Sequence, residues 1–201
     1  RDRTKAMLVV GARPQFIKSA PVIKEILSKH RQIDLSVIHT GQHYDQEMSE
    51  IFFHELKLPA PSANLQVGSG SHATQTGVIM KRLEGRMLKA KPDVVIVPGD
   101  TNTTLAASLA AAKLGIAVSH IEAGLRSGDM TMPEEINRKL TDHCSTVLFA
   151  PTKTAVRNLE REGLGKVTRL TGDTMLDALL TVMPAVEREQ DTILGQLGLQ
   201  P

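Results

Sequence analysis

Short apolar runs alternate with longer amphipathic stretches along this chain from residue 7 onward. The runs are rich in β-branched residues and predict strands at 7–10, 34–39, 93–97, 116–121, 146–149 and 167–170. The stretches between them predict helices at about 15–29, 45–56, 73–90, 103–113, 134–143, 152–162 and 174–189. This alternation predicts an α/β fold, namely a doubly wound, mostly parallel, Rossmann-like sheet with right-handed crossovers.

Proline and glycine mark the ends of several of these predicted helices. Pro14, Pro133 and Pro151 stand where a helix would begin, a place that suits the fixed backbone angle of proline. Gly115 and Gly163 stand where a helix would end, as glycine commonly does. The last residues, 195–201, have the composition of a linker or of the start of a further unit.

The composition favours a folded core and argues against several classes of function. Of the 201 residues, 41% are hydrophobic and 2% aromatic, so the core is built from Val, Ile, Leu and Ala, as in buried parallel strands. A net charge of +2 with no dense Lys/Arg cluster argues against a nucleic-acid partner. Neither a membrane-spanning stretch nor a cleavable signal sequence is visible, so no membrane partner is expected.

Cysteine and histidine usage adds two expectations. The single cysteine, Cys144, lies in a helical, core-like context and is interpreted as a small buried side chain, which predicts a reduced, cytoplasmic protein. The seven histidines are scattered, with no pair at ligand spacing beside a cysteine, so no metal site is expected.

Three predicted strands lead directly into a sharp turn that carries a charged residue. The turns are Gly11-Ala12-Arg13-Pro14, Pro98-Gly99-Asp100-Thr101 and Glu122-Ala123-Gly124-Leu125-Arg126. In an open parallel sheet, ligands bind in the crevice outside the carboxyl ends of the strands. We therefore expect Arg13, Asp100 and Glu122 to share one rim, where a cation and two carboxylates suit an anionic, phosphorylated small molecule.

The first turn lacks the glycine pattern of a dinucleotide fold, and the chain has no phosphate loop of the Gly-Lys-Ser/Thr type. NAD and ATP are therefore disfavoured, and no cofactor is expected. The turn still opens a helix, whose amino end attracts anions, and Arg13 and Lys18 would add positive charge there. The alternative is a solvated arginine in a loop.

The other charged positions each have an ordinary structural alternative. Asp100 precedes four polar residues, Thr101–Thr104, whose hydroxyl groups and the amide of Asn102 can hold sugar hydroxyls. The alternative is helix capping, worth about 1 kcal/mol. Glu122, at the end of an apolar strand, is suited to proton transfer, or else forms an ion pair with Arg126. His43, also after a strand, could meet a phosphate or a ribose, or be structural.

A predicted helix begins at Pro133 and carries two acids in its first turn. Taken alone, these residues are explained by the helix dipole and by pairs at i,i+4 spacing, Glu134 with Arg138 and Glu135 with Lys139. Such pairs are worth only about 0.3–0.5 kcal/mol each.

Five motifs follow one another in a recognisable order over nearly the whole chain. They are Gly11-Ala12-Arg13-Pro14-Gln15-Phe16-Ile17-Lys18, Thr40-Gly41-Gln42-His43, Gly99-Asp100-Thr101-Asn102-Thr103-Thr104, His120-Ile121-Glu122-Ala123-Gly124-Leu125-Arg126 and Pro133-Glu134-Glu135-Ile136-Asn137-Arg138. Together they resemble the non-hydrolysing UDP-N-acetylglucosamine 2-epimerases. Residues 171–178 resemble the segment that leads to the interdomain hinge of that family.

The resemblance implies one half of a glycosyltransferase-B-like fold, in which two Rossmann-like domains face each other across a cleft. Residues 1–190 would form the amino-terminal domain, and residues 191–201 a linker or the start of the missing second domain. That second domain carries a catalytic His-Arg element and most uridine contacts in the family. The resemblance further implies a homodimer, a UDP-sugar substrate, a cytoplasmic location and a role in making cell-surface polysaccharides.

The implied activity is the interconversion of UDP-N-acetylglucosamine and UDP-N-acetylmannosamine. UDP is eliminated to give a 2-acetamidoglucal and is added back with inversion at C2. By position in the motifs, the expected catalytic acids and bases are Asp100, Glu122 and Glu134, and the expected substrate-binding residues are Arg13, Lys18, His43, Asn102, Arg126 and Arg138. We expect the isolated domain to be inactive, because half of a cleft cannot exclude water or hold UDP.

Several alternatives stay open at this point. Gln15-Phe16, Gly41 and Met132–Ile136 also resemble relatives that epimerise UDP-2,3-diacetamido-glucuronic acid, and Gln15 stands where many UDP-N-acetylglucosamine enzymes have glutamate. A glycosyltransferase of similar fold would use a nucleotide-sugar donor. The domain could also be a non-catalytic binding module, and the sheet pattern alone allows a flavodoxin-like or receiver domain.

Overall fold

A computed structural model describes residues 3–42, 55–56, 58–196 and 198. Strands and helices alternate along these residues as β1 (Thr4–Val10), α1 (Arg13–Lys29), β2 (Ile33–His39), β3 (Ala63–Asn64), α3 (His72–Ala90), β4 (Val94–Pro98), α4 (Asn102–Lys113), β5 (Ala117–Ile121), α5 (Pro133–Cys144), β6 (Val147–Ala150), α6 (Lys153–Arg161), β7 (Thr168–Leu170) and α7 (Thr174–Gln196). A short 3-10 turn, Gly165–Val167, precedes β7. The predicted helix at 45–56 lies almost entirely outside the described residues.

The strands form one seven-stranded sheet in the order β3-β2-β1-β4-β5-β6-β7. Every neighbouring pair is parallel, and β1 pairs with β2 on one side and with β4 on the other. The α/β class and the doubly wound parallel sheet are confirmed. The two-residue strand β3 was not predicted, because so short a segment has no periodicity of its own.

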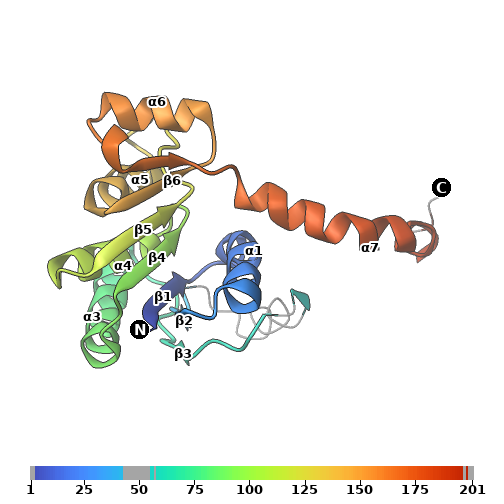
Figure 1. The fold of residues 1–201 in the computed structure, drawn as a ribbon, viewed down its shortest axis with the longest axis horizontal. Helices are drawn as coiled ribbons and strands as arrows, with labels where there is room; N and C mark the ends of the chain where they lie inside the picture. The colour runs from blue at the N-terminus through green and yellow to red at the C-terminus, as the bar shows by residue number, and fades with distance from the viewer. Residues whose placement is uncertain (1–2, 43–54, 57, 197, 199–201) are drawn as a thin grey trace.

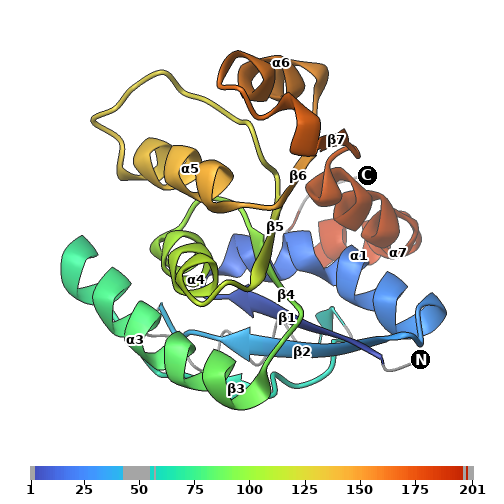
Figure 2. The ribbon, with the colours of Figure 1, turned by 60° about the vertical axis from the view of Figure 1, so that its left-hand side comes forward.

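Helices cover both faces of the sheet (Figures 1 and 2). On one face, Leu8, Val10 and Val37 pack against Phe16 and Ile23 of α1. On the other face, side chains of β1, β4 and β5 pack against α3 and α4, in a cluster that includes Met7, Val9, Val95, Val97, Val118, Ile79, Leu83 and Ala107. Because β1 and β4 are buried on both faces, they contain the continuous apolar runs from which they were predicted.

The helix ends follow local chemistry. α4 and α6 are each followed, two residues after their last residue, by a glycine at positive φ: Gly115 at 70° and Gly163 at 80°. Both confirm the predicted helix stops, since glycine adopts the left-handed conformation without a Cβ clash. α7 extends to Gln196, beyond the predicted end at 189, and projects away from the sheet in Figure 1. The predicted boundary between residues 190 and 191 stays a prediction.

Candidate functional site

The order of the strands changes direction between β1 and β4. From β1 the chain proceeds outward to β2 and β3, and it then returns to place β4 on the other side of β1. Such a switch point leaves a crevice at the carboxyl ends of the two strands. Arg13 follows β1, Asp100 follows β4, and Glu122 follows β5, so all three lie at the same edge of the sheet.

Gln15 holds the turn after β1 in place. Its Oε1 accepts hydrogen bonds from the backbone N–H groups of Gly11, at 2.8 Å, and Ala12, at 3.0 Å. Its Nε2 donates to the carbonyl oxygen of Pro98, at 2.8 Å, and to Oγ1 of Thr104, at 2.9 Å. Both ends of this buried amide are therefore used inside the protein, and Gln15 ties the turn after β1 to the turn after β4.

Lys18 and Glu122 form an ion pair across the crevice, from the first turns of α1 to the end of β5. Their side chains are only 15% and 18% exposed. The backbone of Glu122 has φ 72°, a left-handed conformation that costs energy for a residue with a Cβ. The N–H groups of Glu122 and Ala123 both donate to the carbonyl oxygen of Phe149, at 3.1 and 3.0 Å, and hold this strained turn.

Arg138 on α5 connects two carboxylates. Its Nε and Nη2 lie 3.0 and 2.7 Å from Oδ2 of Asp100, and its Nη1 lies 2.9 Å from Oε2 of Glu135. Asn137 donates to the backbone oxygen of Asp100 at 2.9 Å. The turn after β4 is therefore fixed to the first turns of α5 through both its side chain and its backbone.

Glu135 is fully buried and accepts hydrogen bonds from the N–H groups of Ser127, at 2.9 Å, and Gly128, at 3.2 Å. Burial by itself would raise the pKa of Glu135, but these N–H groups and Arg138 lower it to about 2. The i,i+4 pairs considered from the sequence are not the ones that form, because Arg138 pairs with Glu135 at i,i+3 and with Asp100.

A second group of charged side chains consists of His120 on β5, Arg126 after it, Asp142 on α5 and Glu162 after α6. His120 and Asp142, both fully buried, lie 2.6 Å apart between Nδ1 and Oδ1. The other oxygen of Asp142 lies 2.8 Å from Nη2 of Arg126, which also binds Glu162 at 2.7 Å. Burial would lower the pKa of Arg126, but Glu162 and Asp142 raise it overall. The alternative ion pair between Glu122 and Arg126 is not the one observed, because Glu122 pairs with Lys18.

The polar run after Asp100 is largely occupied within the protein. Thr101 caps α4, its Oγ1 accepting from the N–H of Thr104 at 3.4 Å. Asn102 donates to Gln75 at 2.8 Å and lies 3.1 Å from Nδ1 of His72. Thr103 binds Gln42 and Thr40 at 2.7 and 2.8 Å. Capping and a buried polar network thus account for this run.

Comparison with known proteins agrees with this geometry. The family model described as UDP-N-acetylglucosamine 2-epimerase matches residues 25–200. The chain belongs to the UDP-N-acetylglucosamine 2-epimerase family. A Methanococcus maripaludis protein named "UDP-N-acetylglucosamine 2-epimerase homolog" is 53% identical over 97% of this chain. A Pseudomonas aeruginosa UDP-2,3-diacetamido-2,3-dideoxy-D-glucuronate 2-epimerase is 48% identical over 88% of it.

A solved structure of this epimerase family shows the same fold. The crystal structure of Methanocaldococcus jannaschii UDP-GlcNAc 2-epimerase, in complex with UDP-GlcNAc and UDP, has a TM-score of 0.88 and 50% sequence identity over 92% of this chain. It confirms the resemblance noted from the motifs and the Rossmann-like class of the fold. The chain spans about half the length of its relatives: 54% of the M. maripaludis protein, 50% of the P. aeruginosa protein and 51% of the solved M. jannaschii chain.

The epimerase-family chain brings four of the residues predicted for the site together in two ion pairs. Lys18 contacts Glu122, and Arg138 contacts Asp100. Arg13, the first residue of α1, is exposed at the same edge of the sheet. The guanidinium of Arg126 is instead engaged by Asp142 and Glu162. His43 lies outside the described residues, and the roles assigned to all these residues stay predictions.

Sequence reasoning missed the buried residues that hold the turns of the site in place, namely Glu135, His120 and Asp142. Glu135 was considered only as a helix-surface acid, and the His120–Asp142 pair was not considered at all. One signal was available, since His120 lies inside an apolar strand, where a polar side chain needs a buried partner. Asp142 is 22 residues away in sequence, so no local spacing identifies it as that partner.

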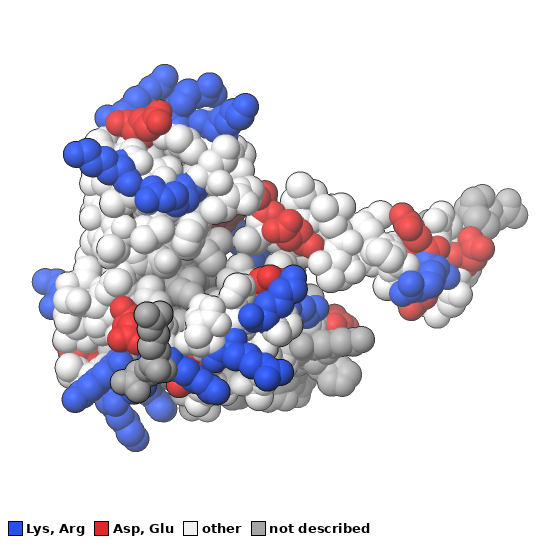
Figure 3. Space-filling view, viewed as in Figure 1, with Lys and Arg blue, Asp and Glu red and all other residues white. Residues whose placement is uncertain are grey.

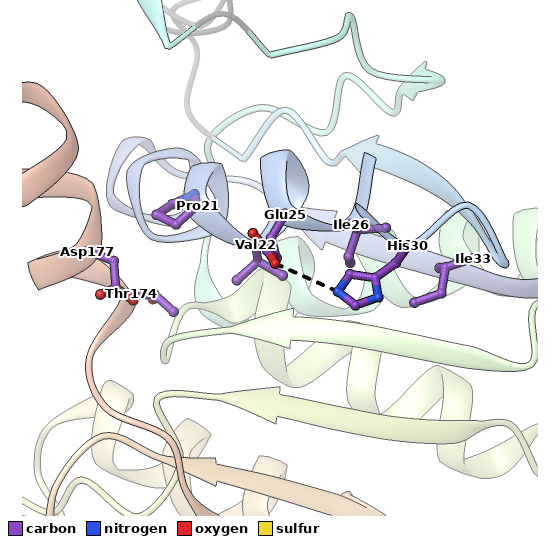
Figure 4. A pocket seen from close by; sticks show the side chains of 8 residues that line it. All are labelled: Pro21, Val22, Glu25, Ile26, His30, Ile33, Thr174 and Asp177. Atoms are coloured by element: carbon purple, nitrogen blue, oxygen red, sulfur yellow. Dashed lines mark ion pairs between the residues drawn. The ribbon is translucent and has the colours of Figure 1, made fainter. Parts of the chain in front are cut away.

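One hollow among the described residues lies away from this crevice. It has a volume of about 570 Å³ and is lined by Pro21, Val22, Glu25, Ile26, His30, Ile33, Thr174 and Asp177, between α1 and the start of α7 (Figure 4). None of these is a predicted site residue, and its polar groups include the loosely paired Glu25 and His30, 3.8 Å apart. We place the site at the charged crevice because that is where carboxylates and cations converge.

The surface adds little to this picture. In the view of Figure 3, Lys and Arg lie in several separate groups, with acidic residues among them. Within the described part of the chain, no group of three or more His, Cys, Asp or Glu side chains could hold a metal ion. The described helices also include none with the length and apolar character needed to cross a membrane.

Proposed function

We propose that this chain forms the amino-terminal half of an enzyme that interconverts UDP-N-acetylglucosamine and UDP-N-acetylmannosamine. Membership of the family and its 53% identity to an epimerase homolog support this activity. The observation that carries the proposal is the convergence of Asp100, Glu122, Lys18 and Arg138 in two ion pairs at the switch point of the sheet.

The chemistry requires proton transfer on both faces of the sugar. In the elimination, a carboxylate takes the C2 proton, the C1–C2 double bond forms, and the C1–O bond breaks with its electron pair leaving on UDP. In the return step UDP oxygen attacks C1 while a carboxyl group delivers a proton to the other face of C2. Asp100, Glu122 and Glu134 would be these acids and bases, and Arg13, Lys18, His43, Asn102, Arg126 and Arg138 would bind substrate or hold the carboxylates.

The second half of the cleft would come from a carboxy-terminal domain, because the relatives are about twice as long as this chain. The apolar side chains exposed along α7, including Leu176, Leu180 and Met183, support such a covering domain. The homodimer, the cytoplasmic location and the inactivity of the isolated domain are parts of the same proposal.

Amide variants test the catalytic assignment. In a protein that joins this chain to the carboxy-terminal half of its M. maripaludis relative, Asp100→Asn, Glu122→Gln and Glu134→Gln should each lower kcat by about 10²–10⁴-fold. This corresponds to about 3–5 kcal/mol in the barrier, well above the worth of a cap or a surface ion pair. Glu84→Gln, on the exposed side of α3, is the matched control and should leave kcat unchanged. Full activity in all three variants would refute the assignment.

Isotope exchange and substrate choice separate the remaining candidates. In deuterated water an epimerase places deuterium at C2 of recovered substrate, whereas a glycosyltransferase transfers the sugar without exchange. The identity of 48% to the P. aeruginosa enzyme keeps UDP-2,3-diacetamido-glucuronic acid as the second candidate substrate. Comparing kcat/KM for the two UDP-sugars decides between them. Turnover by the 201-residue chain alone would contradict the expected inactivity.

A further inference from the structure

His120 is fully buried, and each of its ring nitrogens faces a hydrogen-bond acceptor. Nε2 lies 2.7 Å from the carbonyl oxygen of Gly99, and Nδ1 lies 2.6 Å from Oδ1 of Asp142. A carbonyl oxygen has no proton to give, so Nε2 must donate to it. A lone pair on Nδ1 would then face a carboxylate oxygen, so a second proton has to lie between Nδ1 and Asp142.

The surrounding charges favour placing that proton on the imidazole ring. The carboxylate of Asp142 is also bound by Arg126, which in turn binds Glu162, with His143 3.4 Å from that last carboxylate. Arg126 and the N–H of Gly124 both stabilise the charged carboxylate of Asp142, so the second proton lies on the ring and the pair consists of an imidazolium and a carboxylate. Burial would raise the pKa of Asp142, but His120 and Arg126 lower it.

The pair lies between the two turns that carry proposed acids. The carbonyl held by His120 belongs to Gly99, the residue before Asp100. The second oxygen of Asp142 accepts from the N–H of Gly124, at 3.1 Å, two residues after Glu122. The N–H of Gly99 also donates to Ile121 at 3.0 Å. One buried pair on β5 and α5 therefore connects both turns.

We propose that a doubly protonated His120, held by Asp142, is a positioning residue that fixes the turns carrying Asp100 and Glu122. Because it is fully buried, His120 acts through these backbone groups and does not touch the substrate. The catalytic part of this inference rests on the function proposed above, whereas the protonation and bracing of the turns can be tested without activity.

NMR spectroscopy of the 201-residue chain with 15N-labelled histidine is the first test. We expect both ring nitrogens of His120 to be protonated at neutral pH, with the Nδ1 proton shifted strongly downfield by its short bond to the carboxylate. In Asp142→Asn, the amide can donate to Nδ1, so the ring should become neutral with its proton kept on Nε2. A neutral ring in the unsubstituted chain, or a ring unchanged by Asp142→Asn, overturns the charged pair.

Amide hydrogen exchange tests the bracing. His120→Phe keeps a ring of similar size but removes both donors, so the amides of Gly99 and Gly124 should exchange about tenfold faster or more. The amide of Val9, in the middle of the sheet, should be unchanged. Unchanged exchange at both glycines would refute the positioning role. If His120→Phe does not fold, His120→Gln, which retains one donor for Gly99, should protect Gly99 but not Gly124.

Kinetic measurements on the joined protein, in which this chain is fused to the carboxy-terminal half of its M. maripaludis relative, then separate this inference from the proposed function. His120→Phe should lower kcat while leaving KM for the UDP-sugar unchanged. If the unsubstituted joined protein has no epimerase activity, the proposed function fails while the NMR and exchange results still decide the role of His120. A normal kcat in His120→Phe, beside an active parent, refutes positioning for catalysis.

Discussion

Glu134 and Glu135 are adjacent residues with different surroundings. Glu135 is fully buried against the N–H groups of Ser127 and Gly128 and against Arg138. Glu134 is partly exposed, and within the described residues it makes no hydrogen bond or ion pair. One acid therefore stabilises the loop before α5, while its neighbour in the same helical turn keeps a carboxylate available for the catalytic role proposed here.

The adjacent pair gives a matched stability prediction. Glu135→Gln should lower the free energy of unfolding by about 1–3 kcal/mol, because charge-assisted hydrogen bonds in a buried site are lost. Glu134→Gln should change it by less than about 0.5 kcal/mol, as expected for a surface position. Urea denaturation at neutral pH measures both. Equal effects of the two substitutions would contradict the difference in burial.

The same residue predicts a pH dependence. The folded-state pKa of Glu135 is about 2, below its ordinary value of 4.5, so the unfolded chain binds its proton more readily. The stability it contributes is therefore complete above pH 4.5 and is lost as the pH falls toward 2. In Glu135→Gln, this part of the acid-induced loss should be absent, and denaturation curves across that range would show it.

At the scale of the element, the end of β5 is the strained point of the fold. The backbone turns through φ 72° at Glu122, and the N–H groups of Glu122 and Ala123 both donate to the carbonyl oxygen of Phe149. Strain held in place by surrounding hydrogen bonds is typical of functional turns, since it sets the direction of a reacting side chain.

A pair of substitutions at this position measures the strain. Glu122→Ala and Glu122→Gly both remove the ion pair with Lys18, but only glycine adopts a positive φ without cost. We expect the glycine variant to be more stable than the alanine variant by about 1–2 kcal/mol. At most positions the alanine variant would be the more stable of the two. Chemical denaturation of both variants is the measurement, and an alanine variant of equal or higher stability would show that the turn is unstrained.

At the scale of the whole molecule, α7 packs against α1 but projects away from the rest of the described structure (Figure 1). Ala178 is buried against the body, but the stripe Leu176, Leu179, Leu180, Met183, Val186 and Ile193 is 36–60% exposed. In Figure 3 the middle of this projecting helix is uncharged, with acidic residues near its start and both signs near its end. An apolar surface of this kind is typical of a face that another part of a protein covers.

The exposed stripe has a measurable consequence in solution. The 201-residue chain should bind a hydrophobic dye, and Leu179→Gln with Leu180→Gln should reduce the fluorescence strongly without lowering Tm. Leu27→Gln with Leu88→Gln is the matched control, because both leucines are exposed but stand on different helices. Equal fluorescence from the two double variants would show that α7 does not present this stripe in solution.

The sequence by itself determined the alternation of strands and helices, the parallel sheet and the gathering of charged turns at one edge. These follow from local periodicity and from the rule that parallel strands end together. The five motifs also identified the family, because their order along the chain can be read without any coordinates.

Only the tertiary structure decided which side chains meet. Lys18 and Glu122 are 104 residues apart, and no spacing along the chain distinguishes Lys18 from Arg126 as the partner of Glu122. Glu134 and Glu135 have the same chemistry and the same helix, and the loop at 127–128 folds back onto only one of them. Whether two side chains form an ion pair depends on how elements far apart in the sequence pack against each other. Local sequence patterns do not specify that packing to the accuracy that a hydrogen bond requires.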